Sequence, residues 1–152
     1  RRVRAKTGLD NAGYLTLRVS QLNQLERTCL LIIDEIYVAK RVEYFSGAMH
    51  GLTPHGEIAS TLLCFMVKSL CHKYKDMVAL YPISNLTATQ LYDCFQEVME
   101  MLNQVNINVV GVSLDNAAAN YIPQLCGGTL NTSIVNQPTK QPIFFIIQCC
   151  SH

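Results

Sequence analysis

The chain has 152 residues, enough for one domain with a substantial core, because folding at this length buries about two-thirds of the unfolded surface. Hydrophobic residues make up 49% of it and charged residues 15%, which excludes disordered, collagen-like and coiled-coil proteins. Uncharged apolar runs such as Cys29–Ile33 are short, and the longest, over 62–67, has six residues, whereas a membrane span needs about 20. We therefore expect no membrane partner.

Basic residues gather at the N-terminus. Four of the 12 Lys and Arg residues lie in the first six positions, which leaves 8 basic against 11 acidic side chains in the remainder, a net charge of −3. A domain with a net negative charge would not bind DNA by long-range attraction alone, since duplex binding requires basic side chains that neutralise several phosphates. We interpret residues 1–12 as a basic arm, either a solvated tail or the cut end of a longer chain, and residues 13–152 as the folded part.

Seven cysteines occur, most of them inside apolar runs, which is typical of reduced core residues and favours an intracellular, reducing compartment. No Cys-x-x-Cys pair is present, so the zinc-ribbon and zinc-finger templates fail. The one local cluster, Cys149, Cys150 and His152, leaves a zinc role open. His50 and His55 flank a loop and are interpreted as loop or core histidines rather than metal ligands.

The first half of the chain predicts one helix and a series of strands. Leucines and a valine at steps of three and four predict an amphipathic helix over 13–27. The aliphatic run at 29–38 is typical of a central strand covered on both sides. Alternation over 40–51 predicts a second strand before a Gly- and Pro-containing loop, and 58–72 fits either a strand or a helix.

The second half alternates strands with one clear helix. A short strand is expected at 77–83, closed by its proline. A capping box at Thr87–Gln90 begins a helix that its apolar stripe extends to 105. A strand at 108–115 follows, then a turn or helix start, a polar loop over 127–141 and a last strand at 143–147. This order predicts an α/β fold in which the crossover helix makes the strands at 29–38 and 108–115 parallel.

Two aspartates occupy positions where a carboxylate is costly. Asp34 lies inside the most apolar strand and Asp115 ends another aliphatic strand. Because the two strands are predicted neighbours, both carboxylates could hold Mg²⁺, or Mn²⁺, for an in-line displacement at phosphorus. Glu35 is a poor co-ligand, since successive strand side chains point to opposite faces. The alternative is structural: Asp34 caps a bulge or pairs with a lysine, and Asp115 caps a turn.

Several segments, taken in order, resemble the P-element transposase family, including its THAP-domain relatives. They are Leu30–Ile36, Thr61–Lys68, Tyr74–Ile83 and Gly111–Asn120, and the resemblance covers about residues 10–147. It implies an RNase H-like domain, a mixed sheet with helices on both faces, in a nuclear protein that cuts and joins DNA at transposon ends. Two aspartates and a glutamate hold Mg²⁺ in that family, and Asp34 and Asp115 match the first and second aspartates.

The chain also departs from the family pattern. The family's glutamate lies far downstream, beyond an inserted nucleotide-binding domain, and the sequence ends before it. Gln148 and Cys149 stand where relatives tend to carry Asp and His, and the helix that follows in relatives is absent. Glu97 and Glu100 are interpreted as a solvated helix face rather than a replacement. We therefore expect a C-terminally incomplete domain, inactive alone, with DNA contacts supplied by domains outside this chain.

Two further hypotheses remain beside the transposase fragment. The missing third acid and the charge of −3 favour a domesticated, non-catalytic interaction module that keeps the fold for protein contacts, including contacts in a homo-oligomer. A small α/β domain of unrelated function is the third possibility. Aspartate-dependent binding of Mg²⁺ would count against the interaction module, because a pure scaffold has no reason to bind metal there.

Overall fold

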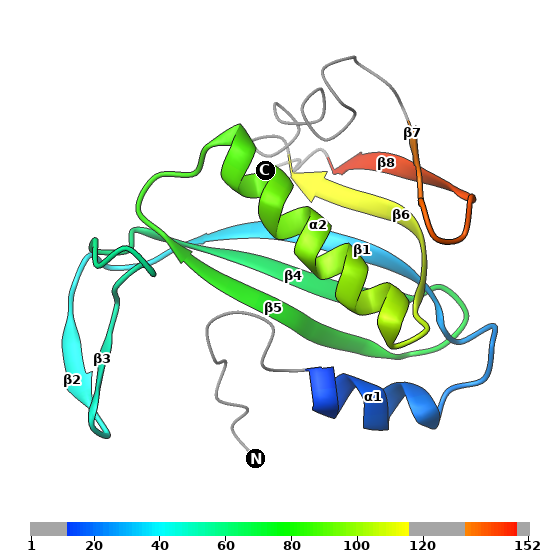
Figure 1. The fold of residues 1–152 in the computed structure, drawn as a ribbon, viewed down its shortest axis with the longest axis horizontal. Helices are drawn as coiled ribbons and strands as arrows, with labels where there is room; N and C mark the ends of the chain where they lie inside the picture. Colours follow the sequence, from blue (N-terminus) through cyan, green and yellow to red (C-terminus); the bar gives the residue numbers. More distant parts are fainter. Residues whose placement is uncertain (1–11, 116–132, 149–152) are drawn as a thin grey trace.

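The computed structural model describes residues 12–115 and 133–148. Within them lie two helices and eight strands (Figure 1). The helices are α1 (Ala12–Ser20) and α2 (Ala88–Gln104). The strands are β1 (Thr28–Tyr37), β2 (Glu43–Phe45), β3 (Ala48–His50), β4 (Thr61–Ser69), β5 (Lys75–Ile83), β6 (Asn108–Asp115), β7 (Ser133–Val135) and β8 (Pro142–Gln148). Neither helix is long and apolar enough to cross a membrane.

Six of the strands form one mixed sheet in the order β5-β4-β1-β6-β8-β7, and β2 and β3 form a separate two-stranded ribbon. The strands β1, β4 and β5 pair antiparallel, whereas β6 pairs parallel to both β1 and β8. The helix α2 connects β5 to β6 across the sheet (Figure 1). The predicted α/β fold with a crossover helix and parallel strands at 29–38 and 108–115 is therefore confirmed.

The two faces of the sheet differ in their covering. In β1, the buried residues Cys29, Leu31 and Ile33 alternate with half-buried ones. The buried set faces both helices. Arg18 of α1 contacts Asp76 of β5, and the pairing of β5 with β4 and of β4 with β1 places Asp76 on the same face as Leu31. We call this side of the sheet the helix face, and the other side, which carries Asp34, the aspartate face. Among the described residues both helices pack on the helix face, so the second helix layer implied by the resemblance is not among them.

The helix α2 begins where the capping box predicted. The Thr87 hydroxyl accepts a hydrogen bond from the Gln90 backbone N–H (3.2 Å), and the Gln90 side chain accepts one from the Thr87 N–H (3.1 Å). Its apolar stripe then packs into the core, with six buried side chains: Leu91, Phe95, Val98, Met99, Met101 and Leu102. Residues of both helices and of five strands share this single core cluster.

The predicted helix over 13–27 is too long. The helix α1 ends at Ser20, and a turn follows in which Asn23 and Glu26 each accept a backbone N–H of the other. These side-chain bonds offer the backbone an alternative to further helix. The side chain of Leu25, which the periodicity placed on the buried stripe, is 69% exposed. The apolar spacing therefore continued past the point where the helix had a core to pack against.

The single strand predicted over 40–51 is wrong. Ser46 and Gly47 both have positive φ angles, 53° and 80°, which reverse the chain in a two-residue turn between β2 and β3. Three smaller differences concern the sheet. The ambiguous segment 58–72 forms β4, the polar segment 127–141 contains β7, and Pro82 lies inside β5. An edge strand tolerates that proline because its other side needs no backbone donor.

Candidate metal site on two neighbouring parallel strands

The backbone brings the two predicted aspartates to neighbouring positions. The strands β1 and β6 run parallel, with Ile33 opposite Leu114, and Asp34 and Asp115 each follow directly. Neighbouring strands lie about 4.8 Å apart, so residues at successive register positions are within reach of one ion. Asp115 also pairs in register with Gln148 of β8. The turn or helix start expected at 116–120 lies outside the described residues.

Asp34 sits in surroundings that leave its charge without a protein counter-ion. It is half-buried, and within the described part of the chain its carboxylate makes no ion pair and no hydrogen bond. The antiparallel partner of Asp34 across β4 is the buried Cys64. Burial and, to a smaller extent, the negative charge of Asp34 together raise the pKa of the Cys64 thiol to about 11. The thiol therefore stays protonated and offers Asp34 no positive charge.

The remainder of the aspartate face near Asp34 is apolar, apart from the hydroxyl of Ser113. Ser113, two positions before Asp115, is 2% exposed, and among the described residues its Oγ has no hydrogen-bond partner. Gly111 lies two positions earlier, where an added Cβ would come within 2.7 Å of the Leu30 side chain. Across β8, the side chains of Phe144 and Ile146 are exposed. The β6 side of the aspartate face is therefore lined mainly by small and apolar residues.

This donor set suits a hard divalent cation. Oxygen ligands are those that Mg²⁺ and Mn²⁺ prefer, and an unpaired half-buried carboxylate gains most from a cation in a low-dielectric setting. The orphaned Ser113 hydroxyl is a further oxygen on the same face. Sequence reasoning missed Cys64 and Ser113 as neighbours of Asp34, because both positions depend on strand pairing rather than on any local motif. The residues present therefore fit the group that the resemblance implies.

The other acidic candidates lie elsewhere. Glu35 alternates with Asp34 along β1 and so occupies the helix face, as expected. Glu97 and Glu100 are exposed on α2, and Glu97 accepts a hydrogen bond from the Tyr81 hydroxyl (2.9 Å). Neither belongs to the aspartate face, in agreement with their interpretation as a solvated helix surface.

The histidine and cysteine candidates are not gathered into a site either. His50 ends β3 and His55 lies in the following loop, and both are exposed. In the part of the chain that the structure describes, no group of three or more His, Cys, Asp or Glu side chains is placed to hold a metal ion. Free cysteines there include the buried Cys29 and Cys64. The candidate zinc cluster of Cys149, Cys150 and His152 lies outside the described residues.

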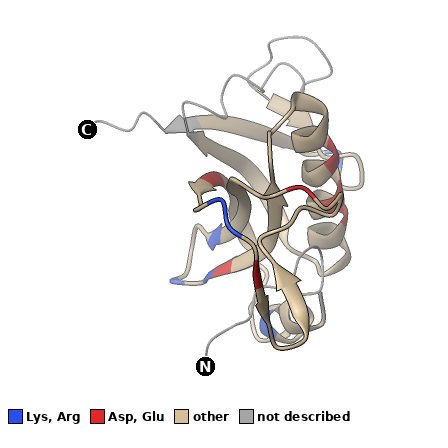
Figure 2. Ribbon diagram, turned by 90° about the vertical axis from the view of Figure 1, so that its left-hand side faces the viewer, with Lys and Arg blue, Asp and Glu red and all other residues tan. Residues whose placement is uncertain are grey.

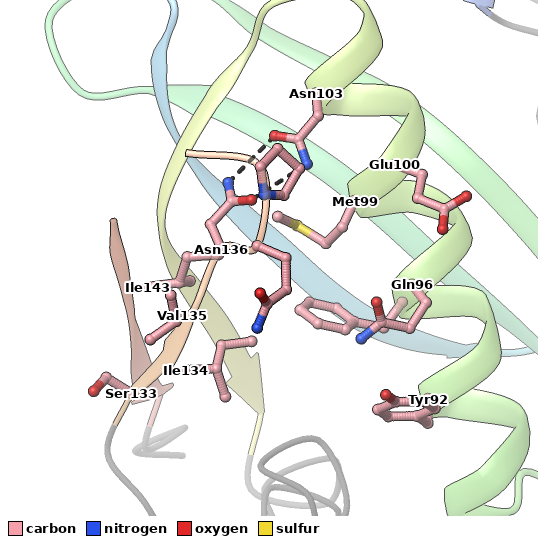
Figure 3. A pocket seen from close by; sticks show the side chains of 13 residues that line it. Tyr92, Gln96, Met99, Glu100, Asn103, Ser133, Ile134, Val135, Asn136 and Ile143 are labelled. Carbon is pink, nitrogen blue, oxygen red and sulfur yellow. Dashed lines mark hydrogen bonds between the residues drawn. The ribbon is translucent and has the colours of Figure 1, made fainter. Parts of the chain in front are cut away.

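A cleft also lies on the helix face (Figure 3), and Asp34 is not among the residues that line it. It has a volume of 650 Å³ and separates α2 from β7 and the turn that follows β7. At one end, the Asn103 and Asn136 side chains exchange two amide hydrogen bonds of 3.2 and 3.4 Å. Amide and apolar side chains line it, and Glu100 is the one charged residue among them. It holds no aspartate pair and no cation for phosphate, so the aspartate face remains the candidate for phosphoryl chemistry.

Comparison with known proteins decides the family. A family model described as "TNP-like, RNase H N-terminal domain" matches residues 10–123, three-quarters of the chain. The chain belongs to this family. The TNP-like RNase H domain also resembles a solved structure, the Drosophila P element transposase strand transfer complex, with a TM-score of 0.73 at 20% sequence identity. No curated protein matches it.

The structural match supports the RNase H-like transposase fold. It covers 96% of this chain and 32% of the transposase chain, so the TNP-like RNase H domain spans about a third of that protein. At 20% identity the likeness shows the fold. The sequence resemblance to the P-element transposase RNase H domain is therefore confirmed at the level of family and fold.

Proposed function

We propose that this domain supplies two metal-binding carboxylates, Asp34 and Asp115, to a DNA transposase that cleaves and joins strands with Mg²⁺ or Mn²⁺. The observation that carries the proposal is the parallel register of β1 and β6, which brings the two positions together on adjacent strands. The solved structure with the same fold is a transposase strand transfer complex, which supports DNA as the substrate.

Each residue of the site has a distinct part in this proposal. Asp34 and Asp115 would hold the cation between their carboxylates, and Asp34 needs no rearrangement to do so because it has no competing ion pair within the described chain. A bound divalent ion activates a water or a 3′-hydroxyl and stabilises the leaving oxygen.

The proposed domain works as part of a larger catalytic assembly. Two carboxylates alone hold an octahedral ion loosely, and efficient sites add further ligands and orienting groups. We assign the third acidic ligand, and the recognition of transposon ends, to segments of the transposase outside these 152 residues. The domain alone is then expected to bind metal with modest affinity and to have little or no nuclease activity.

The test is metal-linked stability with a matched control on the same strand. Wild type, Asp34→Asn, Asp115→Asn and Glu35→Gln are unfolded with urea in EDTA and in Mg²⁺. A ligand that binds the folded state at about 100 times its dissociation constant raises the free energy of unfolding by about 2.7 kcal/mol. We expect that gain in wild type and Glu35→Gln and its loss in both aspartate variants. Equal Mg²⁺ responses in all four proteins would refute the site and favour the non-catalytic interaction module.

The assignment to DNA cleavage has its own test. Nicking of a supercoiled plasmid in Mg²⁺ or Mn²⁺ is compared between wild type and the Asp34→Ala, Asp115→Ala double variant, with Glu35→Gln as control. Any nicking by the chain should require both aspartates. Equal nicking by wild type and the double variant would assign the activity to a contaminant and remove the catalytic role.

A further inference from the structure

The ribbon formed by β2 and β3 stands apart from the main sheet. It pairs only within itself, and it projects from the end of β1 that carries Asp34 (Figure 1). Its base is held by backbone contacts: the Gly51 carbonyl accepts the Ala59 N–H (2.8 Å), and Leu52 bridges to Ile58. Gly51 has a φ of 93° and lies so close to Arg41 that a Cβ there would meet the Arg41 carbonyl oxygen at 2.1 Å. The ribbon is therefore a defined projection with a built base.

Large side chains on and beside this ribbon point into solvent. Tyr44 is 73% exposed and lies directly opposite Met49, which is 57% exposed. Tyr37, where β1 leaves the sheet toward the ribbon, is 80% exposed. An isolated two-stranded hairpin is only marginally stable in water. In this ribbon, no other strand or helix of the described chain covers the cross-strand Tyr–Met pair. Such a ribbon gains most of its stability when a partner covers those side chains.

The charges next to the aromatic rings indicate a polyanion. Lys40 and Arg41 lie at the start of the ribbon, where Figure 2 shows basic residues leading into it. Lys40 has no ion-pair partner within residues 12–115 and 133–148. Arg41 pairs with Glu43, and both side chains are more than half exposed. Exposed pairs of this kind contribute little, so a phosphate can replace the glutamate as partner of Arg41.

We propose that the β2–β3 ribbon binds single-stranded DNA, with Tyr44 stacking on a base and Lys40 and Arg41 contacting phosphates. This inference rests on the proposed function for the choice of DNA. Unpaired bases present a face to an aromatic ring regardless of sequence. Duplex binding relies instead on neutralising several phosphates, and two cations, one of them shared with Glu43, are too few.

The test measures anisotropy of a fluorescent oligonucleotide of about 20 mixed nucleotides, in EDTA so that no strand is cut. The proteins compared are wild type, Tyr44→Ala, Tyr44→Phe and Met49→Ala. Met49→Ala removes the same cross-strand contact as Tyr44→Ala but no aromatic ring, so it reports any melting of the ribbon. Tyr92→Ala, an aromatic residue of α2 at the far cleft (Figure 3), is the control for a tyrosine elsewhere.

We expect Tyr44→Ala to weaken strand binding at least about fivefold, the lower end for one lost base stack. Tyr44→Phe and Tyr92→Ala should bind as wild type does. Lys40→Ala should lower the slope of the DNA binding constant against salt concentration by the amount expected for about one lost phosphate contact. Equal binding by wild type and Tyr44→Ala, or equal losses in Tyr44→Ala and Met49→Ala, would overturn the inference. A Tyr44→Ala effect on self-association in sedimentation, without an effect on DNA, would likewise overturn it in favour of a protein partner.

The two proposals fail separately. Asp34→Asn should bind the oligonucleotide as wild type does in EDTA, and Tyr44→Ala should keep the full Mg²⁺-dependent gain in stability. If Mg²⁺ does not stabilise the wild type but Tyr44→Ala still weakens oligonucleotide binding, only the metal site is refuted. If Tyr44→Ala binds the oligonucleotide as wild type does but Mg²⁺ still stabilises the wild type through the aspartates, only the ribbon assignment is refuted.

Discussion

Replacing Ser113 by alanine is expected to stabilise the chain in the absence of metal, which is unusual for a residue that is 2% exposed. The Ser113 hydroxyl is buried on the aspartate face, and no residue within 12–115 or 133–148 gives it a hydrogen bond. Ser69 provides a matched comparison, since it is 3% exposed and its Oγ accepts the backbone N–H groups of Cys71 (3.3 Å) and His72 (3.1 Å). The two buried serines therefore differ chiefly in whether the hydroxyl is satisfied.

The magnitudes follow from that difference. Keeping an unsatisfied hydroxyl buried costs about 1–3 kcal/mol, and Ser113→Ala removes that cost while deleting a single oxygen from the packing. After a small loss of contacts, a gain of about 1 kcal/mol in the free energy of unfolding is expected. Ser69→Ala removes two hydrogen bonds and should lose about 1 kcal/mol, because the freed N–H groups belong to exposed residues that water reaches.

Urea unfolding followed by circular dichroism in EDTA measures both changes, with the slope of the transition compared to exclude a change in the unfolded state. The prediction is a pair of opposite signs. A loss of stability in Ser113→Ala as large as that in Ser69→Ala would show that the Ser113 hydroxyl has a partner in solution. The description of the aspartate face as lacking one would then be wrong.

Three further changes test other parts of the fold. Thr87→Ala should cost about 1 kcal/mol of unfolding free energy through loss of the helix cap. Thr89→Ala, two residues later and without a capping bond, should cost less, and urea unfolding compares the two variants. Gly51→Ala should cost at least about 1 kcal/mol, because φ is 93° and the new Cβ meets a backbone oxygen, and it should shift the NMR signals of Tyr44; unchanged spectra would contradict the tight base. Burial raises the pKa of the Cys29 thiol to about 11, so its folded form favours the protonated state. That stabilising contribution is complete below about pH 9 and is lost as pH rises through 11; the stability difference between wild type and Cys29→Ala should shrink over this interval, and a constant difference would refute it.

Patterns that are local in the sequence predicted their elements well. The capping box at Thr87 and the stripe behind it predicted α2, and the aliphatic runs predicted β1, β6 and β8. Each of these signals depends on side chains within a few residues of one another. The predictions failed where backbone torsions or available partners decided the outcome. Ser46 and Gly47 reversed the chain, and α1 stopped where Asn23 and Glu26 bonded to the backbone.

The candidate site divides in the same way. Asp34 and Asp115 were found from the cost of a carboxylate in an apolar strand, which is a property of residue type and neighbours. Sequence alone could not identify the Cys64 thiol and the Ser113 hydroxyl as neighbours of Asp34, because their positions depend on how the strands pair. Cys64 in particular lies in a segment whose pattern fitted a helix or a strand equally. The sequence could not predict the exposure of Tyr44 either, since alternation in a strand does not show whether other elements cover its side chains.

The amino-acid sequence by itself determined the type of fold, the family resemblance and the two aspartates on which the proposed chemistry depends. Tertiary structure alone decided that Ile33 stands opposite Leu114, and so that the two aspartates follow at adjacent positions although 81 residues separate them along the chain. The physical reason is that strand register is set by packing of the whole helix face, and no segment contains that information alone.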